Sequence, residues 1–341
     1  MRVLVLKRDK LGDMLLTTPM LAILRGALPQ ATIDVLASDY NAWVLDGNAD
    51  VNRVWSYRRS RVAGRASLSG ALSQLVVGAQ LRWQRYDVAI AAQGEASPRA
   101  TRRARFVGAA RTIAYVDGDE ARISDPLVPP TQGHERDRVI ALLAPLGIAA
   151  PRQLPLPRFR PSQEMLAQAD AWLLAEGLQS RGYAVIGLGT RRAKKQPDRR
   201  QVREWSEWLR RAHGLETVFM WTPGGSDNAS YPGDDATAQR VLEERPSFIH
   251  PFRGPLAPAI GLVWNARVSI FPDSGLMHFA AASPGGVLGL FAESRVSPPP
   301  SQWAPLGPKA QILDAPRSVG DLDDALVFEQ LEALLDSRRA P

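Results

Sequence analysis

The sequence predicts an α/β protein with two Rossmann-like domains that face each other across a cleft, and three observations support this. The length of 341 residues exceeds what one ordinary core needs and suggests about two domains. Short apolar runs alternate with helical segments along almost the whole chain. A segment with four prolines, residues 149–161, interrupts that alternation and is typical of an extended linker. We therefore expect domains over residues 1–155 and 156–341.

The first half of the chain alternates between strand and helix. Its expected strands are short and rich in apolar or β-branched residues: Val3–Leu6, Ile33–Ala37, Val88–Ala92 and Thr112–Tyr115. Helical spacing or composition marks Met14–Leu28, Leu72–Arg85 and Ser97–Val107. Buried strands separated by helices of ten or more residues indicate βαβ units and a parallel sheet.

The same alternation restarts after the linker. The expected strands are Ala184–Leu188, Thr217–Trp221, Val268–Phe271 and Val287–Phe291. The expected helices are Gln163–Leu178, Val202–Ala212, Ala257–Ala266, Leu276–Ala282 and Leu322–Arg338. The sequence leaves open whether the last helix packs back on the first domain. Ligands of such sheets bind outside the carboxyl ends of the strands, so we look for chemistry there.

Composition excludes several classes of protein. A hydrophobic content of 45% and a charged content of 23% are ordinary for a soluble globular protein. The absence of cysteine excludes disulfides and thiolate metal sites. Four histidines without an H-x-x-x-H pair argue against a zinc site. The leading apolar run is too short for a signal peptide, and no stretch reaches the roughly 18 apolar residues of a membrane span. We expect a cytoplasmic protein.

Positive charge is concentrated in one segment. Lys and Arg total 42 against 35 Asp and Glu, a net charge of +7, which favours anionic partners. Between Asp50 and Asp87 there is no acidic residue, yet seven arginines fall there. They form either a solvated face or a docking surface for phosphates or carboxylates. The candidate contacts to an anionic acceptor are Arg58, Arg59 and Arg61, together with His134 and Arg138 farther along the chain.

A carboxylate follows the first expected strand. In KRDKLGDMLLTTP, residues 7–19, Gly12 can take the turn conformation that ends a strand and starts a helix. Asp13 then lies at the N-cap or in the first turn of that helix. An N-cap aspartate would only satisfy backbone N–H groups, and location alone does not separate this role from that of a general base.

A second motif follows the expected strand Val268–Phe271. There the chain reads Pro272-Asp273-Ser274-Gly275, and a helix begins near Leu276. Ser274, Gly275 and the next backbone N–H groups would point into the cleft, where they suit phosphate oxygens. A carboxylate would repel a phosphate, so Asp273 is better suited to accept hydrogen bonds from sugar hydroxyls.

A third candidate is the loop GLGTRRAKKQPDRR, residues 187–200. Small residues and Thr190 let the backbone approach a ligand, and Lys194 with its neighbours supplies cations for a diphosphate. A solvated basic loop explains the same residues.

Two other patterns carry less weight. The D-x-D pattern Asp117-Gly118-Asp119 is interpreted as a solvated turn. The absence of both G-x-G-x-x-G and G-x-x-x-x-G-K-[ST] removes support for dinucleotide oxidoreductase and P-loop readings.

Two stretches together resemble a known family. LGDMLLTTPMLAILRGALPQATIDVLAS and FPDSGLMHFAAA are similar to the signatures of glycosyltransferase family nine, the ADP-heptose:lipopolysaccharide heptosyltransferases. Weaker similarities are ARFVGAARTIAY, HERDRVIALLAPLGI and WAPLGP, so the resemblance spans nearly the whole chain.

The resemblance implies a GT-B fold and an inverting, metal-independent transfer of a heptose, without a cofactor. The donor would be a nucleotide-diphosphate sugar, ADP-heptose, and the acceptor an anionic, lipid-linked lipopolysaccharide core at the cytoplasmic face of the inner membrane. Asp13 matches the general base. The residues that match the family's donor-binding positions are Thr190, Lys194, Asp273, Ser274, Gly275 and His278.

Two departures from the family pattern keep other hypotheses open. The family often has Lys-x-Trp-Pro in the phosphate loop, whereas this chain has Gln196 at the tryptophan position. Members often place a Glu for the nucleotide ribose after a Gly-Gly, where this chain offers Asp227. A non-catalytic or differently specific nucleotide-sugar-binding protein at the membrane surface is therefore the alternative. Nucleic-acid binding has little support, because exposed aromatics do not interleave with the arginines.

Overall fold

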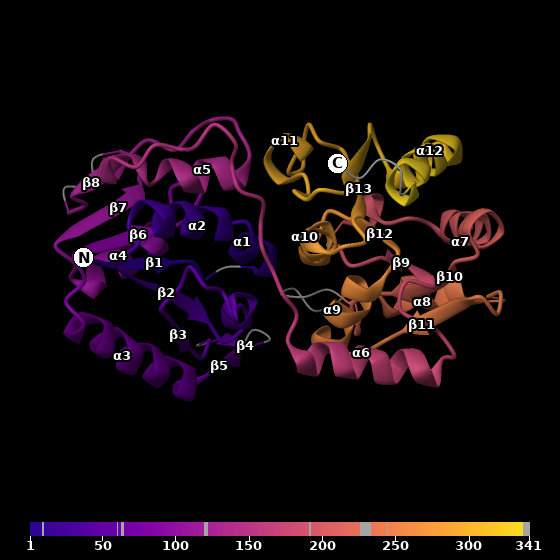
Figure 1. The fold of residues 1–341 in the computed structure, drawn as a ribbon, viewed down its shortest axis with the longest axis horizontal. Helices are drawn as coiled ribbons and strands as arrows, with labels where there is room; N and C mark the ends of the chain where they lie inside the picture. Colours follow the sequence, from indigo (N-terminus) through magenta and orange to yellow (C-terminus); the bar gives the residue numbers. More distant parts are fainter. Residues whose placement is uncertain are drawn as a thin grey trace. The chain divides into compact units, whose positions relative to one another are not determined.

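The protein, in a computed structural model, folds into two compact units, Met1–Arg160 and Pro161–Pro341. Figure 1 shows each unit built on one main β-sheet with helices beside it. The structure describes residues 1–8, 10–59, 61–62, 65–118, 122–190, 192–225, 233–243 and 245–336, without the side chains of residues 61, 62, 65 and 66. The ribose candidate Asp227, Asp119 of the D-x-D pattern and Arg338 at the end of the last expected helix lie outside the described residues.

The first unit holds a parallel six-stranded sheet in the order β3-β2-β1-β6-β7-β8. Its strands are β1 (Arg2–Leu6), β2 (Thr32–Ser38), β3 (Arg53–Tyr57), β6 (Val88–Ala91), β7 (Arg111–Tyr115) and β8 (Asp125–Leu127), with a small β4 (Arg61–Val62) and β5 (Arg65–Ala66) pair. Its helices are α1 (Leu11–Leu15), α2 (Thr18–Ala27), α3 (Leu68–Trp83), α4 (Pro98–Val107) and α5 (Glu135–Ala141), with short 3-10 turns η1 (Ala42–Leu45) and η2 (Ala144–Leu146).

Strand β1 lies at the centre of this sheet. Val3 pairs with Ile33 of β2 on one side and with Val88 of β6 on the other. Val3, Leu4 and Val5 are fully buried, as expected for a central parallel strand covered on both faces. The continuous apolar run at the start of the chain therefore forms the middle of the sheet, and the strand order reverses between β1 and β6.

The helix expected over Met14–Leu28 is divided into α1 and α2. Pro19 lies in the first turn of α2 and has no N–H to donate to the carbonyl of Leu15. The hydroxyl of Thr18 donates to that carbonyl instead, at 2.8 Å, and the hydroxyl of Thr17 donates to the carbonyl of Asp13, also at 2.8 Å. The prediction of one continuous helix was wrong because it passed over this proline.

The second unit repeats the plan with a sheet in the order β11-β10-β9-β12-β13-β14. Its strands are β9 (Tyr183–Gly187), β10 (Glu216–Met220), β11 (Ile249–Phe252), β12 (Val268–Pro272), β13 (Val287–Ala292) and β14 (Ala310–Ala315). Its helices are α6 (Gln163–Ala175), α7 (Arg199–His213), α8 (Asp235–Leu242), α9 (Leu256–Asn265), α10 (Gly275–Ala282), α11 (Pro300–Trp303) and α12 (Asp324–Leu335), with short turns η3 (Ala193–Lys195) and η4 (Val319–Asp321). Two parallel six-stranded sheets with helices confirm the predicted α/β class.

Side chains of one strand alternate between two cores on the two faces of this sheet. Ile270 of β12 belongs to one cluster, and the next residue, Phe271, belongs to the other. The last helix, α12, places Val327 and Leu331 in the first of these clusters, beside Trp205 of α7. The final helix therefore packs on the sheet of the second unit. Within the described residues, no helix has both the length and the apolar character to cross a membrane.

Candidate active site

Both sheets reverse their strand order beside the first strand of the unit, between β1 and β6 and between β9 and β12. Ligands of doubly wound sheets bind at such points, outside the carboxyl ends of the strands. Asp13 follows β1 and Asp273 follows β12, so each predicted carboxylate lies at the switch point of its own unit.

Asp13 lies in the first turn of α1, as one of the two predicted positions. The helix begins at Leu11 and its N-cap is Lys10, so Asp13 is not the capping residue. Its side chain is 15% exposed, and one carboxylate oxygen is 3.9 Å from the ammonium of Lys7. Because Lys10 occupies the capping position, the N-cap interpretation of Asp13 does not hold.

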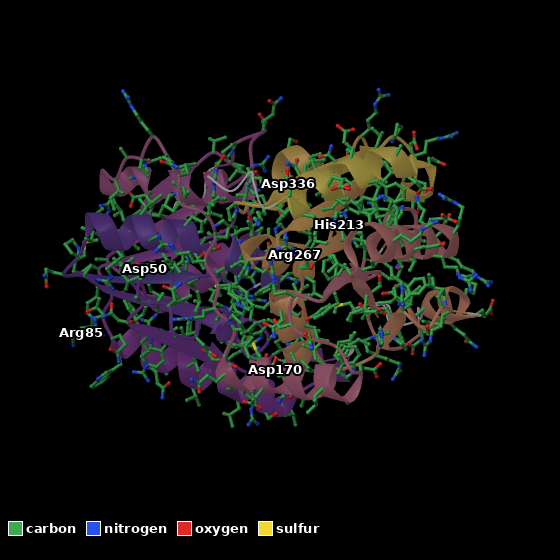
Figure 2. The ribbon with its side chains drawn as sticks, turned by 45° about the vertical axis from the view of Figure 1, so that its right-hand side comes forward. Asp50, Arg85, Asp170, His213, Arg267 and Asp336 are labelled. Carbon is green, nitrogen blue, oxygen red and sulfur yellow. The ribbon has the colours of Figure 1, made fainter. Side chains whose placement is uncertain are left out.

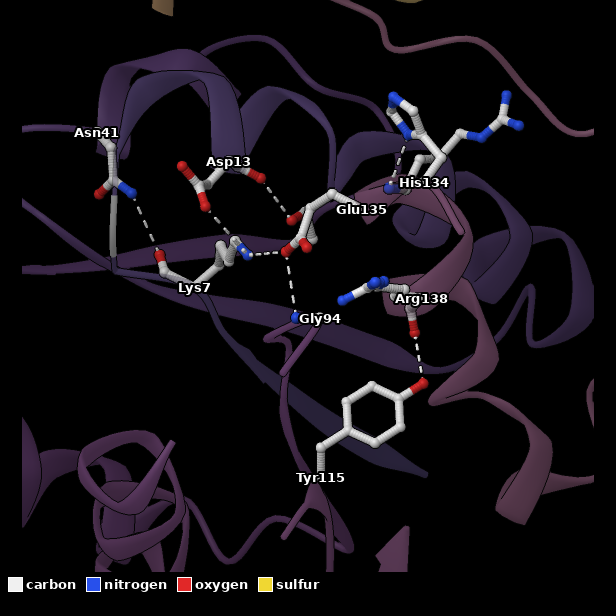
Figure 3. Close-up of polar contacts among 10 residues, drawn as sticks. Lys7, Asp13, Asn41, Gly94, Tyr115, His134, Glu135 and Arg138 are labelled. Carbon is white, nitrogen blue, oxygen red and sulfur yellow. Dashed lines mark hydrogen bonds and ion pairs between the residues drawn. The ribbon is translucent and has the colours of Figure 1, made fainter. Parts of the chain in front are cut away.

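Lys7 follows β1 directly and is completely buried. Its Nζ lies between two carboxylates, 3.4 Å from Oε1 of Glu135 and 3.9 Å from Oδ1 of Asp13, as Figure 3 shows. A buried charge is strongly unfavourable unless it is paired, and this pairing compensates it. The side chain of Asn41 donates to the backbone carbonyl of Lys7 at 3.4 Å.

Glu135 anchors this cluster from the first residue of α5. Its Oε1 also accepts the backbone N–H of Gly94 at 3.1 Å, just beyond β6. A Cβ on Gly94 would lie 2.1 Å from Oε2 of Glu135, so any other residue here would have to displace that carboxylate. The ends of β1 and β6 and the start of α5 therefore converge on Lys7. Sequence reasoning missed Lys7, Gly94 and Glu135; a charged residue directly after a continuous apolar strand was the available signal.

The predicted acceptor contacts fall in two separate groups. His134 is the N-cap of α5, where its Nδ1 accepts the N–H of Arg136 at 3.1 Å, and Arg138 lies on the same helix. The guanidinium of Arg138 donates to two backbone carbonyls of the preceding loop, at 3.0 and 3.3 Å. Its own carbonyl accepts the hydroxyl of Tyr115 at 2.7 Å, and burial raises the pKa of Tyr115 to about 12. His134 and Arg138 thus lie near Glu135, and their hydrogen bonds also stabilise the N-terminus of α5 and the loop that precedes it.

The arginines after β3 form the second group. Arg58 is exposed, while Arg59 pairs with Asp39 at 3.2 Å and stacks over the ring of Tyr40. The side chain of Arg61 lies outside the described part of the structure. This group therefore follows the edge strand β3, and the predicted acceptor residues do not form one cluster.

In the second unit, Lys195 rather than the predicted Lys194 pairs with Asp273. The Nζ of Lys195 bonds Oδ2 of Asp273 at 2.7 Å, and its side chain is only 3% exposed. It also lies 5.5 Å from the ring centroid of Phe291. Lys194 is 62% exposed and pairs with Glu293 at 2.6 Å. Both lysines belong to the short turn η3, in which Lys194 is exposed and Lys195 is buried. Sequence reasoning missed Lys195.

Ser274, Gly275 and His278 lie at the start of α10. Ser274 is the N-cap in an extended conformation and makes no capping bond with its side chain. Its hydroxyl is buried and has no hydrogen-bond partner among the described residues. Gly275 is the first helical residue, and His278 is buried three positions later. The leading N–H groups of a helix favour an anion, so the predicted phosphate contacts are in suitable positions.

Gln196 replaces the family tryptophan with a buried hydrogen-bond donor. Its Nε2 donates to Asp234 at 2.7 Å and to the carbonyl of Leu188 at 3.2 Å, so it ties the loop to β9. Burial raises the pKa of Asp234. Thr190 is half-buried in the same loop, directly after β9. The amide of Gln196 therefore fixes this loop through hydrogen bonds rather than through aromatic packing.

Asp234 and Asp235 are the described acidic residues closest in sequence to the ribose candidate, and Asp235 is held by ion-pair and hydrogen-bond partners. Arg253 donates to both of its carboxylate oxygens, at 3.0 and 2.9 Å, and Trp221 donates at 2.7 Å. The Arg253 guanidinium holds the pKa of Asp235 well below its usual range. A carboxylate held in this way supports the fold rather than a ligand. Among the residues that the structure describes, no three acidic or histidine side chains are grouped to hold a metal ion.

Three solved structures are similar to this chain. Glycosyltransferase family 9 from Veillonella parvula DSM 2008 has a TM-score of 0.79 and 19% identity, over 98% of this chain and 97% of that one. ADP-heptose lps heptosyltransferase II from E. coli has a TM-score of 0.75 and 22% identity, over 100% of both chains. E. coli heptosyltransferase WaaC with ADP has a TM-score of 0.74 and 20% identity, over 98% of this chain and 100% of that one. These likenesses confirm the predicted GT-B class of fold.

The sequence itself gives the family. No protein of curated function matches the chain significantly. The profile described as glycosyltransferase family 9 (heptosyltransferase) matches residues 75–321, well over half of the chain. The chain therefore belongs to glycosyltransferase family 9, the heptosyltransferases.

Proposed function

We propose that this glycosyltransferase transfers a heptose from ADP-heptose to an anionic, lipid-linked lipopolysaccharide core saccharide, with inversion and without a metal. The reaction would take place at the cytoplasmic face of the inner membrane. The observation that carries the proposal is Asp13, held at the switch point of the first unit beside the buried Lys7. The neighbours in structure named for ADP and ADP-heptose support the choice of donor.

The proposed step is a single displacement. An acceptor hydroxyl oxygen attacks the anomeric carbon of the heptose while Asp13 takes the hydroxyl proton. The new C–O bond forms as the bond between that carbon and the diphosphate oxygen breaks, and the electron pair leaves with the diphosphate. Lysine side chains and the N–H groups that follow Ser274 would stabilise the charge on the leaving group. Transfer requires that the bound donor reach Asp13.

The donor contacts are proposed from the second unit. Asp273 would accept hydrogen bonds from sugar hydroxyls, and Ser274, Gly275 and His278 would contact phosphate or sugar. Thr190 and Lys194 remain predicted phosphate contacts, and Lys195 joins them because it pairs with Asp273 at the end of β12.

The test is Asp13→Asn, assayed by ADP release from ADP-heptose in the presence of a core acceptor. We expect kcat to fall about 10²–10⁴-fold, since general base catalysis contributes that much, while the donor Kd changes little. Asp50→Asn is the matched control in the same unit; Figure 2 labels Asp50. Turnover of Asp13→Asn within a few-fold of the unmodified protein would contradict the assignment.

Measurements of donor binding and of transfer distinguish this enzyme from the alternative, a non-catalytic nucleotide-sugar-binding protein. A thermal-shift screen with ADP-, UDP- and GDP-sugars identifies the donor, because a ligand that binds the folded state stabilises it by mass action. Tight binding of ADP-heptose without transfer to any core acceptor would favour a non-catalytic binding protein.

A further inference from the structure

Helix α3 of the first unit turns its large apolar side chains toward solvent. An ordinary surface helix buries its apolar stripe and exposes polar residues. Here the buried positions are Gly70, Gly78 and Leu81, and several of the exposed ones are large and apolar. The outward residues, called the α3 face below, are Leu68 (91% exposed), Leu72 (63%), Leu75 (65%), Val76 (48%) and Trp83 (85%). Contiguous exposed apolar side chains of this kind mark an interaction surface.

Packing against α4 fixes this orientation of α3. A Cβ on Gly78 would lie 2.6 Å from the ring of Phe106, so the two helices approach closely at that point. The guanidinium of Arg82 donates to the carbonyl of Phe106 at 2.9 Å, and Arg103 donates to the side chain of Gln74 at 2.9 Å. Figure 1 shows α3 along the lower edge of the first unit. The α3 face therefore points outward because its opposite side is already occupied.

The α3 face lies within the most basic part of the chain. Residues 51–110 contain eleven arginines, no lysine and two acidic residues, Asp87 and Glu95. The net charge of this segment, +9, exceeds the +7 of the whole chain. Arg82 and Arg85 lie at the carboxyl end of α3 and are exposed, and Figure 2 shows Arg85 projecting from the outer edge of the unit. Helix α4 adds the exposed Arg99 and Arg102.

We propose that the α3 face docks on an anionic phospholipid bilayer. The helix would lie in the plane of the interface, with Leu72, Leu75 and Trp83 inserted among the acyl chains near the headgroups. The arginines would bind lipid phosphates, which their planar guanidinium groups match. Apolar side chains inside a basic surround are the combination that such a surface requires. A neutral protein surface would not explain the arginines.

Charge also decides between a bilayer and a second copy of this chain. A two-fold contact through α3 would place two segments of net charge +9 against each other, which like-charge repulsion opposes. An anionic bilayer complements the same charge. This docking surface rests on the proposed function in one respect: a lipid-linked acceptor would require the protein to work at a membrane. Binding to lipid is measured without any donor or acceptor.

The experiment is co-sedimentation of the full chain with phosphatidylcholine vesicles that contain 30% phosphatidylglycerol. We expect Leu72→Glu/Leu75→Glu to weaken binding at least tenfold, because both side chains would enter the apolar layer. Arg82→Gln/Arg85→Gln should weaken binding about fivefold for each arginine and reduce its sensitivity to salt. The matched controls in the second unit are Leu174→Glu, at an 83% exposed leucine, and Arg317→Gln, and both should bind normally.

Each outcome supports or overturns the docking surface. Normal vesicle binding by Leu72→Glu/Leu75→Glu would overturn it, as would equal binding to pure phosphatidylcholine. A dimer in light scattering that the same double substitution disrupts would show that a second copy covers the face. Transfer to a delipidated core saccharide should be unchanged in the double variant. If that variant loses vesicle binding while even the unmodified protein shows no transfer, the docking surface is supported and the proposed function is contradicted.

Discussion

The two units each bury a lysine at the point where their strand order reverses, but they pair it differently. Lys7 of the first unit is shared between Glu135 at 3.4 Å and Asp13 at 3.9 Å. Lys195 of the second unit bonds Asp273 directly at 2.7 Å. The longer ion pair stabilises the Asp13 carboxylate without direct hydrogen-bond contact to the lysine, which suits a group that must accept a proton from a substrate.

The tighter pair explains an otherwise unfavourable charge in the second unit. A carboxylate beside a phosphate site would repel the donor diphosphate, and Asp273 directly precedes the start of α10. Lys195 neutralises this carboxylate, which would leave the partially positive N–H groups of the helix start to act on the phosphates of the proposed donor. The same pair of residue types would therefore hold the proposed base in one unit and compensate a repulsive carboxylate in the other.

Substitution of Lys7 should have the largest effect on the fold. Lys7→Met leaves the Glu135 and Asp13 carboxylates uncompensated, and we expect the free energy of unfolding to fall by about 3–5 kcal/mol. Urea denaturation followed by circular dichroism measures this change. Lys7→Met/Glu135→Gln should recover much of the stability but not the kcat, since Asp13 still lacks its cation. Full activity in that double variant would show that Lys7 serves only the fold.

Gly94 tests how closely the first cluster is packed. A methyl group at this position meets Glu135 at 2.1 Å, so Gly94→Ala must displace the carboxylate that pairs with Lys7. We expect a loss of about 2 kcal/mol in the free energy of unfolding, within the usual range for overpacking. The matched control is Gly26→Ala, a helical glycine with nothing within 4 Å of the added atom, which should be neutral or slightly stabilising. Equal stability of the two variants would contradict the packing argument.

These contacts show what the sequence could and could not predict. The buried run Val3–Leu6 predicted the central strand, because continuous apolar character is typical of strands covered on both faces. Lys7 and Glu135 are 128 positions apart in the sequence, and no periodicity relates them. Only the reversal of strand order and the placement of α5 bring them together. Distant ionic contacts of this kind depend on topology, which a single sequence does not show.

Other differences had local signals that sequence reasoning did not use. Pro19 lacks the N–H that a continuous helix over Met14–Leu28 requires, and the structure divides that helix. Strand β3 lies in the arginine-rich segment and places the exposed Ser56 between the buried Trp55 and Tyr57, as in a strand with one covered face. Lys194 and Lys195 are adjacent in a loop, where composition does not determine which side chain is buried.

The two adjacent lysines of the second unit give the next prediction. We expect Lys195→Met to raise the Kd for ADP-heptose about tenfold, or 1.4 kcal/mol, because Asp273 would then repel the diphosphate. Lys194→Met removes only an exposed pair with Glu293 and leaves the Lys195–Asp273 pair intact, so we expect a smaller rise in this Kd. Titration calorimetry with ADP-heptose measures both. A larger loss of affinity in Lys194→Met would instead favour the residue that the family resemblance indicates.

The smallest expected effect concerns the buried Asp234, to which Gln196 donates at 2.7 Å. Burial raises its pKa in the folded protein above the ordinary value of 3.8, so the folded state binds the proton more tightly than the unfolded state. The free energy of unfolding therefore decreases as the pH rises from about 4 through the raised pKa, and the cost is fully present above it. Asp234→Asn keeps an acceptor for Gln196 and removes the charge. It should stabilise the protein at pH 7 by about 1 kcal/mol or less, and this gain should disappear near pH 4. Urea denaturation at the two pH values measures the difference, and a gain that is the same at both would show that the carboxylate charge is not its cause.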